Sequence, residues 1–141
     1  MAFTACEKQT IGKIAQVLAK SPEAYGAECL ARLFVTHPGS KSYFEYKDYS
    51  AAGAKVQVHG GKVIRAVVKA AEHVDDLHSH LETLALTHGK KLLVDPQNFP
   101  MLSECIIVTL ATHLTEFSPD THCAVDKLLS AICQELSSRY R

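Results

Sequence analysis

Apolar residues recur every three or four positions along most of the 141-residue chain, the spacing of one face of an α-helix. Stretches that alternate with period two, as a half-buried strand would, are few. Two of the helical stretches carry a histidine within their apolar face. On the first, His59 lies between Val56 and Val63, and on the second, His88 lies one turn after Leu84. The pattern predicts an all-α protein with two histidines on apolar helix faces.

Start and stop signals divide the chain into six long helices and a short one. Thr4 and Glu7 have the spacing of a capping box, and Ser21 and Ser118 each precede a proline, as N-cap residues often do. The predicted helices begin after Thr4, at Pro22, near residue 40, near residue 53, before His88, at Asp95–Pro96 and after Ser118. The helix near residue 40 is short and spans about 40–44, and the one that begins near residue 53 runs to about 72. Pro100 would be the fifth residue of its helix, where it should remove one hydrogen bond.

Gly26 lies inside the second predicted helix, where glycine costs roughly 1 kcal/mol relative to alanine. Such a glycine indicates that another backbone passes close by, and Gly60 and Gly61, beside His59, are the expected partners. The chain contains no internal repeat and no linker-like segment. We therefore expect a single domain over residues 1–141.

Charge and cysteine content restrict the function. Lys and Arg total 15, as do Asp and Glu, so no basic bias indicates nucleic-acid binding. No apolar run is long enough to predict a membrane span or a signal peptide. Five cysteines without a CxxC pair indicate free thiols, and hence a reducing, cytoplasmic environment.

Two further segments could carry chemistry. The connector between residues 38 and 52 is rich in aromatic side chains that could cover the core or form a binding wall: Tyr43, Phe44, Tyr46 and Tyr49. The segment from His73 to His80 contains three histidines, but His78 and His80 are two positions apart and would point to different sides of a helix. We interpret it as a solvated turn rather than a metal site. Taken alone, His59 and His88 could likewise be ordinary core residues.

Several motifs in order resemble the globin family, and within it the α-type subunits of vertebrate haemoglobins. They are EAYGAECLARLF, KSYF, VHGGKV, VDPQNF, HLTEFSP and the terminal YR, which together span nearly the whole chain. The short connection between Tyr49 and the His59 helix also fits the α type. The resemblance implies an all-α globin fold of six long helices and a short one around a non-covalent haem b.

By resemblance, His88 matches the proximal ligand of the haem iron, and His59 matches the distal histidine that hydrogen-bonds bound O2. The other residues that match the haem pocket are Tyr43, Phe44, Tyr46, Lys62, Val63, Leu84, Leu92, Val94, Asn98, Phe99, Leu102 and Leu136. Tyr46 and Lys62 match positions near the haem propionates. A single imidazole ligand leaves the opposite side of the iron open for O2, CO or NO.

The resemblance implies reversible oxygen transport, without enzymatic activity, as the α subunit of a cooperative α2β2 tetramer with a β-type chain in red blood cells. Residues matching the subunit contacts fall into three sets: Tyr43, Asp95 and Asn98 at the sliding contact; Asp126, Lys127, Tyr140 and Arg141 near the C-terminus; Arg32, Phe117 and His122 at the tighter contact. Neither nucleic acid nor a membrane is an expected partner.

Some positions depart from the usual pattern, and three of these lie on the surface that would meet the β chain: Gly39, Ser42 and Glu45. Leu93 replaces a usually charged residue, Tyr46 a histidine and Lys47 an aromatic residue, and the chain has no tryptophan. We expect cooperativity to persist with altered strength and pH sensitivity. The alternatives are a haem enzyme with peroxidase- or nitrite-reductase-like activity, a single-subunit oxygen store, and a helical interaction domain without a cofactor.

Overall fold

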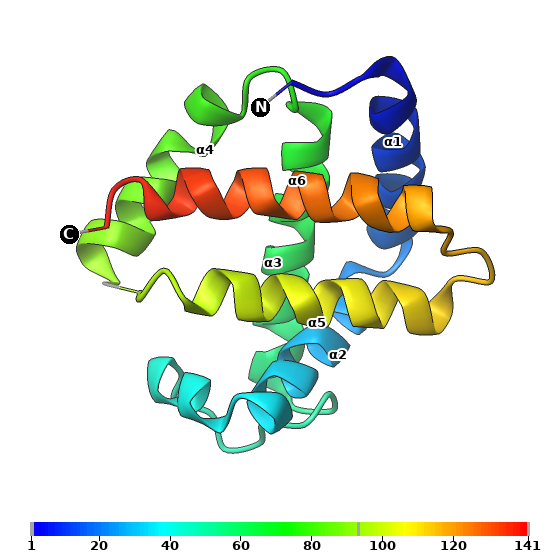
Figure 1. Cartoon of the computed structure of the whole chain (residues 1–141). Coiled ribbons are helices and arrows are strands. Elements are labelled where there is room, and N and C mark those ends of the chain that lie inside the picture. The colour runs from blue at the N-terminus through cyan, green and yellow to red at the C-terminus, as the bar shows by residue number, and fades with distance from the viewer. Residues whose placement is uncertain (1, 93, 141) are drawn as a thin grey trace.

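The structure is a computed structural model that describes residues 2–92 and 94–140, and every regular element within those ranges is helical (Figure 1). The elements are α1 (Ala5–Lys20), α2 (Pro22–Thr36), the 3-10 helix η1 (Pro38–Tyr43), α3 (Ala54–Glu72), α4 (Leu77–Leu86), the π-helical turn η2 (Thr87–Lys91), α5 (Asn98–His113) and α6 (Pro119–Ser137). The predicted all-α class is confirmed. None of the described helices is long and apolar enough to cross a membrane.

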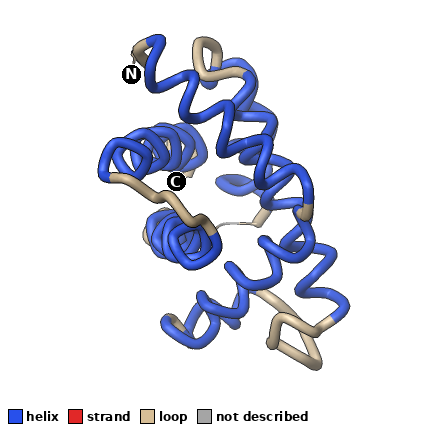
Figure 2. The backbone as a smooth tube through the Cα atoms, turned by 90° about the vertical axis from the view of Figure 1, so that its right-hand side faces the viewer, coloured by secondary structure: helices blue, strands red, loops and turns tan. Residues whose placement is uncertain are grey.

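Helices α5 and α6 lie side by side and antiparallel, and α3 crosses them from behind in Figure 1. Figure 2 views this pair almost end on, with their connecting loop toward the reader. α1 packs on α3 and α6, and α4 packs on α6. The main core lies between these helices, and Ile64, Ile106 and Leu128 are among its nearly inaccessible side chains. A second cluster, which includes Leu30 and Phe34, joins α2 to the connector that follows it.

Two of the three predicted serine or threonine caps form. Thr4 accepts a hydrogen bond from the Glu7 amide at 3.1 Å, and Glu7 Oε1 accepts one from the Thr4 amide at 2.8 Å. Ser118 caps α6 by accepting from the Thr121 amide at 3.2 Å. The Ser21 side chain caps nothing, contrary to the prediction. Ser21 is the only residue between α1 and α2, and its amide closes α1 on Leu18 O, so its backbone does not adopt the extended shape that Thr4 and Ser118 share.

Pro100 does not remove a helical hydrogen bond, contrary to the sequence-based expectation. The Asp95–Pro96 pair begins a turn rather than the helix, and Asp95 Oδ1 accepts from the Gln97 amide at 3.0 Å. α5 begins at Asn98, which makes Pro100 its third residue. The first four amides of a helix have no intrahelical partner, so proline fits there.

Gly26 and Gly60 mark the closest crossing in the fold, between α2 and α3. A Cβ atom on Gly26 would overlap the backbone of Gly60, and one on Gly60 would lie 2.6 Å from the Ala27 nitrogen. The expected crossing is confirmed for Gly60. Gly61 instead lies beside the Glu23 side chain, whose Cγ would be 3.0 Å from an added Cβ. Because α3 carries His59, this crossing sets the position of that histidine.

Candidate functional site

His88 lies in the π-helical turn η2 that continues α4. The turn is wider than an α-helix, since the Leu92 amide donates to Thr87 O at 3.0 Å, five positions back. His88 Nδ1 lies 2.8 Å from Leu84 O. A carbonyl oxygen can only accept, so Nδ1 carries a proton, and in the neutral ring Nε2 is the nitrogen with the free lone pair. The ring also meets the Phe99 ring at a centroid distance of 5.6 Å. The turn therefore holds an imidazole with one unprotonated nitrogen.

His59 lies in the middle of α3 and is half-buried. Its ring centroid is 5.2 Å from that of Phe44 in the connector. Burial lowers the pKa of His59, and the positive charge of Lys62 lowers it further. His59 is therefore a neutral imidazole at pH 7, with one N–H to donate.

Four of the apolar side chains that the sequence assigned to a pocket share an intermediate exposure. Val63, Leu84, Phe99 and Leu102 are all half-buried. Their neighbours on the same helices point into the core, where Ile64, Leu81 and Ile106 are buried. Val67 and Met101 are half-buried too; their apolar character is visible in the sequence, but only the fold places them beside this set. Both histidines thus lie on helix faces whose apolar side chains remain partly exposed.

The aromatic connector is anchored to the core rather than free. Phe34 of α2 packs edge-on against three connector rings, at centroid distances of 5.4 Å to Phe44, 6.2 Å to Tyr46 and 5.2 Å to Tyr49. The Tyr49 hydroxyl donates to Phe44 O at 2.8 Å, a role that the sequence did not indicate. These contacts hold Phe44 against His59.

The other residues predicted for the pocket differ from one another in burial and in the contacts they make. The Tyr43 hydroxyl accepts hydrogen bonds from the Asp95 amide at 3.2 Å and from Asn98 Nδ2 at 3.4 Å, which ties the connector to the start of α5. Leu136 is buried in the main core, Val94 is half-buried and Lys62 is exposed. Leu92 is 56% exposed and packs in neither core cluster. Leu93 and Arg141, which the sequence analysis singled out, lie outside the described residues.

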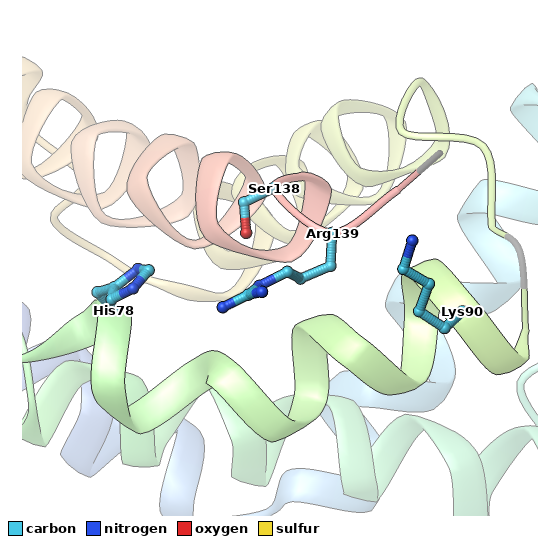
Figure 3. A pocket seen from close by; sticks show the side chains of 4 residues that line it. All are labelled: His78, Lys90, Ser138 and Arg139. Carbon is cyan, nitrogen blue, oxygen red and sulfur yellow. The ribbon is translucent and has the colours of Figure 1, made fainter.

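A cavity of about 430 Å3 opens elsewhere, between α4 and the chain end, and is lined by His78, Lys90, Ser138 and Arg139 (Figure 3). Arg139 pairs with Glu82 at 3.1 Å and His78 with Glu135 at 2.8 Å, so carboxylates offset much of the positive charge. None of the predicted pocket residues lines this cavity. It marks the contact between the chain end and the η2 turn, where a Cβ on Gly89 would lie 2.6 Å from the Arg139 carbonyl carbon.

The fold has close counterparts in known proteins. The family profile described as Globin matches residues 27–136. This chain belongs to the globin family. Haemoglobin subunit alpha of Heterodontus portusjacksoni is 52% identical over 140 residues, covering 99% of this chain and 95% of the relative. The same subunit of Squalus acanthias is 50% identical over 140 residues, covering 99% of each chain.

The solved haemoglobin structure of the shortfin mako, Isurus oxyrinchus, superposes on this globin with a TM-score of 0.98 at 80% identity, covering 99% of this chain and 100% of that one. The deoxy haemoglobin of Dasyatis akajei gives 0.97 at 45% identity, with the same coverage. The predicted globin fold and the resemblance to haemoglobin α subunits are therefore confirmed.

Membership of the globin family implies haem binding, and the residues of this chain fit that group. Haem is a large apolar ring whose iron binds a neutral imidazole well. His88 offers an unprotonated Nε2, fixed by a backbone carbonyl that orients the ring. The half-buried apolar side chains around it, such as Leu84 and Phe99, would be covered by such a ring.

Proposed function

We propose that this chain binds haem b without a covalent link and carries O2 reversibly as the α subunit of an α2β2 haemoglobin in the red-cell cytoplasm. The observation that carries the proposal is the pairing of two unequal histidines among half-buried apolar side chains. His88 has its Nδ1 proton held by Leu84 O, and His59 is neutral because burial lowers its pKa. Haem, when bound, supplies the iron to which O2, CO or NO binds.

In this proposal His88 Nε2 would hold the iron as its one protein ligand. Neutral His59 would offer one N–H to a partly negative ligand such as O2 and would stabilise it electrostatically. Val63 lies one turn after His59 on α3 and would limit the space beside the ligand. Phe44 packs on the His59 ring and would cover part of the cofactor.

We infer a carrier rather than an enzyme. Peroxide or nitrite chemistry is helped by charged groups that move protons near the iron or pull on its histidine ligand. Among the described contacts, the His88 ring bonds to a backbone carbonyl rather than a carboxylate, and no carboxylate bonds to His59. Apolar walls around His59 and His88 also limit the entry of water and protons, which otherwise favour oxidation of ferrous iron.

A β-type partner in a tetramer is supported by surface features on α2 and α5. Val35 of α2 is 79% exposed and Val108 of α5 is 47% exposed, and the Arg32–Thr109 hydrogen bond of 2.6 Å joins the same two helices. Large exposed apolar side chains gathered on neighbouring helices are typical of a protein interface. His122 and Phe117, whose rings lie 5.6 Å apart, belong to the same predicted contact.

The sliding contact and the C-terminal contacts are also part of the proposal. Gly39, Ser42 and Glu45 are exposed, and the Ser42 hydroxyl bonds back to Gly39 O at 3.0 Å. Lys127 is engaged within the chain by Glu7 at 2.9 Å, whereas Asp126 and Tyr140 are exposed. A smaller side chain at residue 39 and a carboxylate at residue 45 should change the depth and charge of the surface that meets the β chain.

Oxygen equilibrium curves of the native assembly at two pH values, with and without organic phosphate, test the proposed function. We expect sigmoidal curves that shift with pH. A hyperbolic, pH-independent curve would contradict the cooperative tetramer. Sedimentation with and without the β chain then separates a subunit of an assembly from a single-chain oxygen store.

A further inference from the structure

His73 and His80 form a stacked pair on the surface, away from the haem-binding face. Their ring centroids are 4.0 Å apart and their planes differ by only 4°. His73 ends α3, and His80 lies in the first turn of α4. From helical spacing, His78 and His80 were considered as a possible pair. The structure instead places His80 against His73. The His78 ring bonds to Glu135 instead, at 2.8 Å.

The backbone between the two helices holds this pair in place. The Asp76 amide donates to His73 O at 2.9 Å, and the His80 amide donates to Asp76 O at 3.0 Å. These bonds form a tight turn between α3 and α4, which brings the backbones of the two histidines close together. Lys8 Nζ also fixes the turn by pairing with Asp75 at 2.9 Å.

Each ring has a nitrogen suited to a metal ion. His73 Nδ1 donates to Lys69 O at 2.8 Å, so in the neutral ring Nε2 is the nitrogen with the free lone pair. Metal-binding histidines commonly have this backbone contact on their second nitrogen. The described contacts include no hydrogen bond to the His80 ring, and both rings are partly exposed.

Charges of both signs surround the pair. Burial lowers the pKa of His80, the positive charge of Lys69 lowers it further, and the carboxylates of Asp76 and Glu72 raise it. Both rings must be neutral to bind a metal ion. A cation held by the rings would be attracted by the two carboxylates and repelled by the ammonium of Lys69.

We propose that His73 and His80 form a surface site for a borderline-soft divalent ion such as Zn2+, bound through one nitrogen of each ring. Zn–N bonds are about 2.0 Å, so the exposed rings must turn from stacking until two nitrogens face one ion. No group of three or more ligand side chains within residues 2–92 and 94–140 could hold an ion, so water completes the coordination. The site joins the end of α3 to the start of α4 and does not depend on the proposed oxygen transport.

Calorimetric titration of the haem-loaded full chain with Zn2+ tests the site, in the carbonmonoxy form and a non-chelating buffer near neutral pH. The exposed thiols of Cys6 and Cys123 are alkylated first in every sample, because thiolates also bind zinc. We expect one zinc ion per chain. His80→Ala should weaken binding by about tenfold or more, and His73→Ala should do the same, because either change leaves one protein ligand.

His122→Ala is the matched control, since His122 is exposed on α6 and far along the chain from the pair. It should leave zinc binding unchanged. An absence of stoichiometric binding, binding that survives His80→Ala, or an equal loss in His122→Ala would each overturn the site. Circular dichroism and the haem absorption band of each variant separate lost ligands from lost folding. The His80 variant is decisive, because its ring makes no described hydrogen bond.

Discussion

His88 donates its Nδ1 proton to the carbonyl oxygen of Leu84 across 2.8 Å, one turn back along α4. The bond fixes the tautomer of the imidazole and the direction of its other nitrogen. Because the acceptor is a neutral carbonyl and not a carboxylate, it places no full negative charge beside the ring. In the proposed function His88 would be the one protein ligand of the iron, which would leave the other side of the iron free for O2.

Replacement of His88 by glycine should remove the iron ligand while leaving room for a free imidazole. We expect His88→Gly to give an altered haem absorption spectrum that returns toward the wild-type spectrum when imidazole is added. His78→Gly, in the first turn of the same helical segment, should leave the spectrum unchanged. A wild-type spectrum of His88→Gly without imidazole would show that another residue binds the iron.

His59→Leu should speed the release of O2, because it removes the N–H donor while keeping an apolar side chain. A hydrogen bond to a charged acceptor contributes about 1.5–3 kcal/mol, which corresponds to a rate increase of about ten- to a hundredfold. Stopped-flow measurements of O2 and CO release provide an internal control, since bound CO carries less charge. Equal acceleration for the two gases would argue for a steric effect instead.

Removal of the haem should destabilise the protein, because Leu84, Phe99 and Leu102 would lose the apolar ring that covers them. Binding at a hundred times the dissociation constant adds about 2.7 kcal/mol, so we expect the thermal midpoint to fall by about 10 °C or more. Thermal unfolding followed by circular dichroism compares the two forms. Equal midpoints with and without haem would contradict the proposed pocket.

Gly26→Ala should weaken the α2–α3 crossing, because its methyl group would overlap the Gly60 backbone. Overpacking of this kind costs about 3 kcal/mol, and a rigid backbone cannot move aside as a side chain can. Gly12→Ala is the matched control, since nothing lies within 4 Å of its added Cβ in α1. It should stabilise the helix by about 0.5–1 kcal/mol. Urea unfolding of the haem-loaded variants measures both, and a tolerated Gly26→Ala would contradict the crossing.

Local rules predicted much of the fold because they depend on neighbouring residues. The capping box of Thr4 and Glu7 needs only three positions of sequence, and it forms as expected. Ser21 failed as a cap because it ends one helix while it starts the next. The π-helical turn around His88 was not predicted from the sequence, and its Gly89 lies against the Arg139 backbone at the far end of the chain, a contact that no local pattern reveals.

The candidate site could be predicted only in part. Helical periodicity found His59 and His88 but could not distinguish them from core residues, and it was the resemblance to globins that assigned their unequal roles. The hydrogen bond to Leu84 O and the lowered pKa of His59 come from the folded structure. Helical spacing also could not predict that His73 stacks on His80, because the two residues belong to different helices with a turn between them.

Repeated cycles between air and argon test oxygen carriage most directly. The haem-loaded ferrous chain, assembled with its β partner, is followed by visible absorption through each cycle. We expect the oxygenated and deoxygenated spectra to alternate with little loss per cycle, because His59 stabilises the ligand and the apolar walls exclude water. Conversion to the ferric form within the first cycles, or the absence of an oxygenated spectrum in air, would contradict the proposal that this chain is a reversible oxygen carrier.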